Sequence, residues 1–438
     1  MFRVLRLATI AALILANPAG AAPPNVILVL ADDLGYGDIG ANGNRRIATP
    51  NIDRMAREGV RLTGFYASAN VCTPSRAGLL TGRYAIRSGL GHKVVESGDT
   101  HGLPAGELTL AEMLQDVGYY TALVGKWHLG HTPAHWPTRH GFDTFYGLPY
   151  SNDMRPLALY RGDSKIEEPV TQETLTERYT TEVIRQIELA GDQPFFIFLS
   201  HTFPHIPLYV SDRFSGRSKA GLYGDVVETI DWSMGRILET LEEQHLDDNT
   251  LVIFTSDNGA WFEGDNGPYR EGKGSTWEGG YRVPFVARWP GRLPAGRVSG
   301  ELSMNIDLLP TIAALAGSDL PEDLKLDGHN IWPLLNGAQS PHDVIYFFDD
   351  ENIAALRTPR WKLMVLSYYR RNIAAFERFE PGLGFNNWLL FDMHDPRPGR
   401  YSLARENPAV LADMLALLAA GRQQFEPLRT QPPPSVLP

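Results

Sequence analysis

Four short apolar runs in this chain each end in a cluster of polar residues. The runs and the polar residues that follow them are NVILVL (25–30) before ADD, TALVG (121–125) before KWH, PFFIFLS (194–200) before HTFPH, and TLVIFTS (250–256) before DNG. Apolar runs of this length are typical of strands buried on both faces of a largely parallel sheet. Because ligands bind at the carboxyl ends of such strands, the polar clusters are predicted to mark the functional edge.

Helix signals lie between these runs. The predicted helices are NIDRMARE (51–58) after Thr49 and Pro50, LAEMLQDV (110–117) after Thr109, and a long amphipathic segment at 224–244. Threonine before a helix and proline in its first turn are common start signals. Strands that alternate with helices predict a doubly wound α/β sheet.

From about residue 340 the pattern changes to short β-rich pieces such as IYFFDD (345–350), followed by a helical stretch at 407–425. A chain of 438 residues also exceeds the usual size of one domain. We therefore expect a large α/β domain with a mixed, doubly wound sheet over residues 23–340. A smaller C-terminal α+β domain is expected over residues 341–438.

The first 22 residues have the pattern of a secretory signal peptide. Arg3 and Arg6 precede an apolar run from Leu7 to Ala16, and small residues follow at 19–21. The run is far shorter than the roughly 20 residues of a spanning helix. The sequence therefore predicts an exported protein, periplasmic or secreted, without a membrane anchor. Its formal net charge of −11 makes nucleic acid an unsuitable partner.

Cys72 is the only cysteine in the chain, and it lies in VCTPSRAGLLTGR (71–83), where a helix is expected to start near Pro74. A single cysteine cannot form a disulfide within the chain, so it is a free thiol, an intermolecular link or a chemically altered residue. A buried small hydrophobe is the alternative. The polar neighbours Thr73, Ser75 and Arg76 do not suit an apolar slot.

Oxygen-bearing side chains follow two of the predicted strands. Asp32 and Asp33 follow the first run, and Asp257 and Asn258 follow the run at 250–256. Either pair alone is typical of an ordinary turn. Together at one sheet edge, three carboxylates would repel one another unless a cation lay between them. Oxygen ligands without imidazole or thiolate favour a hard ion, Ca²⁺ first and Mg²⁺ second.

Five basic residues lie just beyond predicted strands, in glycine-rich loops or beside the cysteine. They are Arg76, Lys126 and His128 in GKWHLG, His205 in PHIP, and Lys273 in EGKGSTWEGG. A single histidine among 12 is more often a loop residue than a catalyst. Their placement where backbone can approach a ligand, and their positive charge, favour an anionic substrate bound against a metal.

CTPSR (72–76) matches the CxPSR signature of the type I, formylglycine-dependent sulfatases, and AGLLTGR matches its continuation. Further matching stretches are PPNVILVLADDLGYGD (23–38), GYYTALVGKWHLG (118–130), GFDTFYGLPYSND (141–153), IFTSDNG (253–259) and GKGSTWEGGYRVP (272–284). The chain resembles this family over about residues 23–340, and within it arylsulfatase A and N-acetylgalactosamine-6-sulfatase most closely. LFDMHDPRPGRYSL (390–403) fits the family less well. The resemblance implies an alkaline-phosphatase-like fold and hydrolysis of aryl or carbohydrate sulfate esters to alcohol and inorganic sulfate.

In this family a formylglycine-generating enzyme oxidises the cysteine of CxPSR before folding, which implies that Cys72 is the precursor of an aldehyde. The hydrated aldehyde offers two hydroxyls, one to attack sulfur and one to expel sulfate afterwards. The resemblance further implies a Ca²⁺ site formed by Asp32, Asp33, residue 72, Asp257 and Asn258.

The resemblance also implies roles for residues that contact the substrate. Arg76 would orient the modified residue, whereas Lys126 and Lys273 would neutralise the sulfate group and Ser151 would contact it. These roles follow from the positions at which this chain matches the family.

Two histidines are expected to transfer protons. His205 would protonate the leaving alcohol, with Lys273 as a competing donor, and His128 would take the proton that releases the sulfate. We prefer His205 to His201 because the family pattern places the histidine two residues before a proline, as in HIP.

Two alternative functions stay open at this point. Phosphomonoester, phosphodiester and phosphonate ester hydrolases share the superfamily, although they often use two metals with histidine ligands that this sequence does not show. A non-catalytic, Ca²⁺-stabilised glycan-binding protein is the second alternative, expected if Cys72 stays unmodified. The substrate, a sulfated small molecule or glycan, would be selected by loops such as 152–172 and 261–270.

Overall fold

The computed structural model describes residues 22–366, 388–395 and 399–430. Apart from Ala22, the predicted signal peptide lies outside these residues. The described part contains a ten-stranded sheet with the strand order β11-β2-β10-β9-β1-β8-β4-β5-β6-β7. Its strands are β1 (Asn25–Ala31), β2 (Val60–Leu62), β4 (Tyr120–Lys126), β5 (Thr144–Leu148), β6 (Leu159–Arg161), β7 (Ser164–Glu167), β8 (Phe195–Ser200), β9 (Thr250–Ser256), β10 (Phe285–Arg288) and β11 (Arg297–Ser299).

The four apolar runs form the centre of this sheet as parallel neighbours. β1 pairs with β9 on one side and with β8 on the other, and β8 pairs with β4. The prediction of buried parallel strands is confirmed. β10 runs antiparallel to β9, so the sheet is mixed, as expected. All four polar clusters therefore lie at the same edge.

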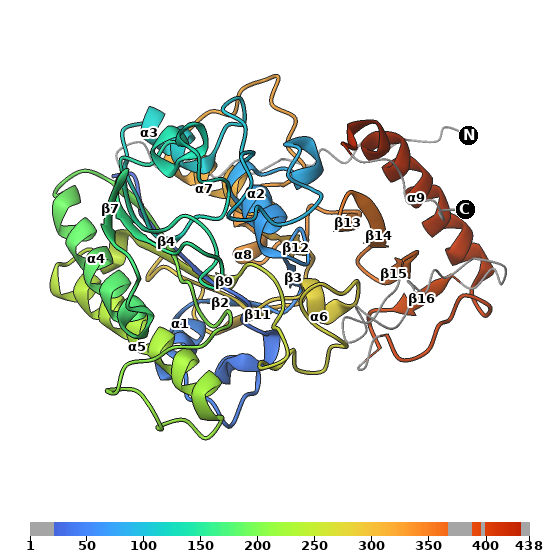
Figure 1. Cartoon of the computed structure of the whole chain (residues 1–438). Helices are drawn as coiled ribbons and strands as arrows, with labels where there is room; N and C mark the ends of the chain where they lie inside the picture. Colours follow the sequence, from blue (N-terminus) through green and yellow to red (C-terminus); the bar gives the residue numbers. More distant parts are fainter. Residues whose placement is uncertain (1–21, 367–387, 396–398, 431–438) are drawn as a thin grey trace, which may run out of the picture.

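Helices cover both faces of the sheet (Figure 1). One core cluster holds apolar residues of α2, α3 and α7, and a second holds those of α1, α4 and α5. Alternate residues of β1 enter the two clusters. The helices of this part are α1 (Pro50–Glu58), α2 (Cys72–Thr81), α3 (Leu110–Asp116), α4 (Leu175–Ala190), α5 (Gly221–Glu243), α6 (Glu278–Tyr281), α7 (Leu308–Ala316) and α8 (Trp332–Leu335). The predicted helices correspond to α1, α3 and α5.

A separate antiparallel sheet follows, with α9 (Pro408–Phe425) on its outer side (Figure 1). Its strands are β13 (Ile345–Asp349), β14 (Asn352–Arg357), β15 (Trp361–Met364) and β16 (Leu389–Asp392). The small C-terminal α+β unit is thereby confirmed, while its boundary near residue 340 stays a prediction. The Lys362 ammonium, on β15, lies 2.7 Å from the buried Glu278 carboxylate on α6. This ion pair connects the C-terminal unit to the large α/β domain.

In a separate two-stranded ladder, β3 (Phe65–Tyr66) pairs with β12 (Ser303–Met304). Phe65 packs in a core cluster of the large sheet, whereas Tyr66 and Met304 pack with apolar residues of the C-terminal sheet. Within the ranges that the structure describes, none of the helices combines the length and apolar character that a bilayer crossing requires.

Candidate active site

The carboxylates predicted at the sheet edge meet in the structure. β1 and β9 are parallel and in register, with Ala31 opposite Ser256, so the residues that follow them are neighbours. The Asp33 amide donates to the Asp257 carboxylate at 3.1 Å, and the Asn258 amide group donates to Asp33 at 2.8 Å. All of these residues are buried. The strand order therefore converts two distant sequence motifs into one acidic cluster.

Two residues at this edge have left-handed backbone conformations. Asp33 has φ of 67° and His128 has φ of 63°. Such angles are uncommon for residues other than glycine and concentrate at functional sites, where the surrounding structure imposes them. Asp33 lies two residues after the end of β1, and His128 lies two residues after the end of β4. The chain therefore turns sharply at the edge of the sheet where both side chains enter the site.

Cys72 is the first residue of α2, a helix whose ten residues are all buried. Its Sγ lies 3.5 Å from an oxygen of Asp32 and 3.3 Å from the Lys273 ammonium. Burial raises the pKa of the Cys72 thiol, and this effect outweighs the neighbouring lysines. The thiol is therefore neutral at ordinary pH and a weak nucleophile.

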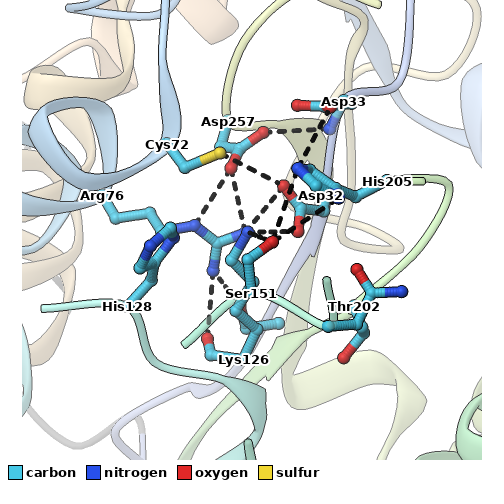
Figure 2. A network of polar contacts seen from close by, with 12 residues as sticks. Asp32, Asp33, Cys72, Arg76, Lys126, His128, Ser151, Thr202, His205 and Asp257 are labelled. Atoms are coloured by element: carbon cyan, nitrogen blue, oxygen red, sulfur yellow. Dashed lines mark hydrogen bonds and ion pairs between the residues drawn. The ribbon is translucent and has the colours of Figure 1, made fainter. Parts of the chain in front are cut away.

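Arg76 lies one turn further along α2 and binds both carboxylate-bearing strands (Figure 2). Its Nε donates to Asp257 at 3.0 Å, its Nη2 lies 2.9 Å from the same carboxylate as an ion pair, and its Nη1 donates to the Lys126 carbonyl at 3.0 Å. The same Nη1 also donates to the Ser200 hydroxyl at 2.6 Å. This planar group thus fixes the position of α2 against the ends of β4, β8 and β9.

Two lysines pair with the aspartates of the first cluster. The Lys126 ammonium lies 2.5 Å from Asp32 and 3.3 Å from the Ser151 hydroxyl. The Lys273 ammonium lies 2.9 Å from Asp33. Burial alone would raise the pKa of Asp32, but Lys126 and Arg76 outweigh it and hold that pKa well below its usual value. Asp32 is therefore ionised.

These pairs correct one argument made from the sequence. The mutual repulsion of Asp32, Asp33 and Asp257 was expected to require a cation. In the structure Arg76 and Lys126 lie among the carboxylates (Figure 2), and Lys273 pairs with Asp33, so that all three supply balancing charge. Sequence reasoning assigned Lys126 and Lys273 to the sulfate and Arg76 to the modified residue, and it overlooked their pairing with the acids. Repulsion by itself does not demand a metal.

The donor set nevertheless fits a hard cation. One ligand atom from each of Asp32, Cys72 and Asp257 lies within 4.8 Å of the other two. The Asn258 carbonyl oxygen is buried and has no hydrogen-bond partner, which is costly unless another group coordinates it. Burial and the Asp32 carboxylate raise the pKa of Asp257, and a cation beside them would oppose that shift.

His128 is buried and neutral. Its Nε2 lies 3.1 Å from the Val95 carbonyl, which requires the proton on that nitrogen and leaves Nδ1 as an acceptor without a partner. Burial and the nearby Lys126 and Arg76 hold the pKa of His128 well below its usual value. Nδ1 is therefore available to accept a proton.

His205 joins the cluster, whereas His201 does not. Nε2 of His205 lies 3.4 Å from the Ser151 hydroxyl and 3.8 Å from Asp33. Burial and Lys273 lower the pKa of His205. Both ring nitrogens of His201 are buried without partners, and burial alone lowers its pKa to about 3. His205 therefore contacts Ser151 and lies near Asp33, and its role as proton donor stays a prediction.

Sequence reasoning missed two residues that support the site. Ser200, the last residue of β8, accepts the hydrogen bond from Arg76, and its position at a strand end could have indicated it. The Asn305 amide group donates to the carbonyl and hydroxyl of Ser75 at 3.0 and 2.9 Å. Asn305 lies 230 residues from Ser75 in the sequence, and no local pattern marks it.

The family model described as Sulfatase matches residues 24–318. The chain belongs to the sulfatase family. A second model, described as N-sulphoglucosamine sulphohydrolase, C-terminal, matches residues 272–380 of this sulfatase.

Relatives and solved structures agree with that assignment. Human N-acetylgalactosamine-6-sulfatase is 42% identical over 364 residues, which cover 76% of this chain and 70% of the relative. The PsFucS1 sulfatase from Pseudoalteromonas sp. superposes with a TM-score of 0.84 at 30% identity, over 94% of this chain and 92% of the other. Ps i-CgsB, solved in complex with k-i-k-neocarrahexaose, gives 0.81 at 30% identity, over 92% and 94%.

Family membership decides among the functions that the sequence left open. The sulfatase is a sulfuric ester hydrolase with the alkaline-phosphatase-like fold, and the resemblance read from its motifs is confirmed. A phosphate or phosphonate ester hydrolase and a non-catalytic glycan-binding protein are thereby set aside.

Proposed function

We propose that this sulfatase cleaves carbohydrate or aryl sulfate esters with a formylglycine at position 72 and a Ca²⁺ ion, or secondarily Mg²⁺, beside it. The observation that carries the proposal is the state of Cys72: a buried, neutral thiol at a helix start, surrounded by charged groups. Such a thiol is unsuited to attack an anion. A formylglycine hydrate supplies a hydroxyl nucleophile at the same position.

Residue 72 must be modified before the chain folds. Every residue of α2 is buried, including all of CTPSR. A formylglycine-generating enzyme can reach these residues only in an extended chain. The predicted signal peptide, which directs export to the periplasm or beyond, is consistent with modification before or during that passage.

Asp32, Asp33, residue 72, Asp257 and Asn258 would hold the cation. Bound there, a hard divalent ion polarises the sulfate oxygens and makes the nucleophile more acidic. Arg76 fixes the helix that carries residue 72 through its contacts with Asp257 and Ser200.

Five side chains of the chain suit the anionic ester and its products. Lys126 and Lys273 place two ammonium groups beside residue 72, where they neutralise the sulfate. The Ser151 hydroxyl, between Lys126 and His205, donates to a sulfate oxygen. Nε2 of His205 donates a proton to the leaving alcohol, since a bound sulfate anion opposes the effects that lower its pKa. Nδ1 of His128 accepts the proton that accompanies release of inorganic sulfate.

Two relatives support a carbohydrate ester as the substrate. The name N-acetylgalactosamine-6-sulfatase denotes an aminosugar sulfate, and Ps i-CgsB was solved with a bound neocarrahexaose. The loops at 152–172 and 261–270 are the segments in which we expect substrate choice to be made.

The test measures modification and activity together. The protein is produced with and without a co-expressed formylglycine-generating enzyme, and the peptide containing residue 72 is analysed by mass spectrometry. We expect activity toward an aryl sulfate to rise in proportion to the aldehyde fraction and to be absent in Cys72→Ala. Full activity in a preparation that contains only the thiol would refute the proposed nucleophile.

A further inference from the structure

A second site of positive charge lies away from the catalytic cluster. Arg45, Arg46, Arg217 and Lys219 line an open groove of about 450 Å³. The groove lies between the segment that leads into α1 and the loop that precedes α5, which lie together in the lower part of Figure 1. The Arg46 guanidinium donates to the Lys219 carbonyl at 2.9 Å, so the two segments are in direct contact. We call this feature the basic groove.

The cations of the basic groove have no acidic partners. All four are exposed, and within the described residues none of them forms an ion pair with a carboxylate. The protein as a whole carries a formal net charge of −11. Four unpaired cations in one groove of an acidic chain create a local positive potential that favours binding of an anion.

The carboxylates near the groove accept hydrogen bonds from backbone amides. Asp53 accepts from the Ala41 amide at 2.6 Å, and Glu228 accepts from the Ala48 amide at 3.1 Å. The buried Asp225 accepts from the amides of residues 216–218 at 2.7 to 2.8 Å. These bonds fix the two loops that carry the cations. Four cations face two groove-lining carboxylates, so the groove has an excess of positive charge.

Aromatic side chains next to the groove contact one of its arginines and a neighbouring one. The Arg213 guanidinium lies 5.0 Å from the ring centre of Phe214 and 4.9 Å from that of Trp232, and Arg217 lies 5.7 Å from Phe214. Phe214 is buried beneath these groups. The rings thus stabilise arginines, and they are not presented as free surfaces on which nucleobases could stack.

The groove is linked to the catalytic cluster through both of its loops. The segment with Arg45 and Arg46 follows β1 and contains Asp33, and the loop with Arg217 and Lys219 follows β8 and contains His205. Both loops therefore leave the functional edge of the sheet and converge again at the groove.

We propose that the basic groove binds a sulfated polysaccharide and holds it while a sulfate group is cleaved at residue 72. This proposal rests on the proposed carbohydrate substrate. Guanidinium groups suit sulfate because they offer planar pairs of donors. The basic groove therefore favours a polymeric, multiply charged molecule as the natural substrate over a single sugar or a small aryl ester.

The test compares polymeric and small substrates in one triple variant. Arg45→Ser, Arg217→Ser and Lys219→Ser are combined, whereas Arg46, which holds the two loops together, is retained. A control removes the same charge from the exposed residues Arg139, Lys325 and Arg405. Three exposed charge contacts together contribute roughly a fivefold to tenfold change in affinity. We therefore expect KM for chondroitin sulfate or dextran sulfate to rise by that factor in the groove variant only.

Small-substrate kinetics separate failure of this proposal from failure of the proposed function. Both variants should retain wild-type kcat and KM for an aryl sulfate, which reports on the catalytic site alone. If that activity is absent in the unaltered protein, the proposed function fails. If it is present while the groove variant keeps its KM for the polymers, the groove proposal is overturned.

Direct binding identifies the class of ligand. Binding of dextran sulfate to the Cys72→Ala protein is measured beside uncharged dextran, polyuridylate and vesicles containing phosphatidylserine. We expect the sulfated polymer to bind most tightly, and the binding to weaken between about 0.05 M and about 0.3 M NaCl as screening increases. Tighter binding of polyuridylate or of the vesicles, or equal binding of uncharged dextran, would contradict the assignment.

Discussion

The Lys273 ammonium lies 3.3 Å from Sγ of Cys72 and 2.9 Å from the Asp33 carboxylate. Burial disfavours its charged form, but Asp33 and neighbouring anions outweigh burial and raise the pKa of Lys273 above its usual value. The lysine therefore stays charged while it contacts both Cys72 and Asp33, a proposed metal ligand. It links substrate neutralisation to the charge balance of the site.

Replacing this lysine should reduce activity strongly. In Lys273→Ala one preorganised positive group is lost beside the sulfate, and we expect kcat/KM for an aryl sulfate to fall by roughly 10²- to 10³-fold. Lys325→Ala, which removes an exposed lysine, serves as the control. Initial rates on preparations matched for formylglycine content measure the effect. A loss below about threefold would argue against contact between Lys273 and the substrate.

Asn258 tests the cation site without measuring activity. Because its buried carbonyl oxygen lacks a partner, we expect it to contribute to ion affinity. Ca²⁺ should raise the Tm of the EGTA-treated protein, since a ligand that binds only the folded state stabilises it. Asn258→Leu should weaken this response at a given Ca²⁺ concentration, whereas Asn258→Asp, which keeps an oxygen, should retain it. An identical Ca²⁺ response in the leucine variant would exclude Asn258 as a ligand.

The role of His205 predicts a dependence on the leaving group. A general acid contributes roughly 10²- to 10⁴-fold when the leaving alcohol is a poor one. His205→Ala should therefore lose most activity toward a sugar sulfate and much less toward an activated aryl sulfate, whose phenolate leaves without a proton. The measurement is steady-state kcat/KM of the wild type and of His205→Ala on both esters. Equal losses on both esters would favour Lys273 as the proton donor.

Asp38 should make stability depend on pH. It is buried and accepts hydrogen bonds from Tyr223 at 2.6 Å and from Gly35 at 2.9 Å, yet burial outweighs these bonds and raises its pKa to about 7. Between about pH 4 and pH 7 the folded state holds a proton that the unfolded state has released. This contribution is complete below about pH 4 and is lost as the pH rises through 7, by up to about 4 kcal/mol.

The measurement compares pH slopes rather than absolute stabilities. Urea unfolding of the wild type and of Asp38→Asn is followed from pH 5 to pH 8. Asparagine does not titrate, so the variant should lack this part of the decline, whatever its overall stability. Parallel slopes in the two proteins would show that Asp38 is ionised throughout.

The sequence determined the parts of this protein that depend on local patterns. Unbroken apolar runs gave β1, β4, β8 and β9, because a strand buried on both faces needs apolar residues at every position. Because these strands are parallel, the polar residues that follow each run in the sequence lie at the carboxyl edge of the sheet. CTPSR was sufficient to single out Cys72, because a lone cysteine among polar neighbours is not typical of an apolar environment, although the structure buries its side chain.

The tertiary structure decided which of these groups touch. Arg76 and Asp257 are 181 residues apart, and their contact depends on β1 lying between β8 and β9, an order that periodicity does not encode. The same is true of Asn305 beneath Ser75, and of Arg46 against Lys219 in the basic groove. Charge balance in the site follows from these contacts, since electrostatic energy depends on distances in space. Those distances exist only once the chain has folded.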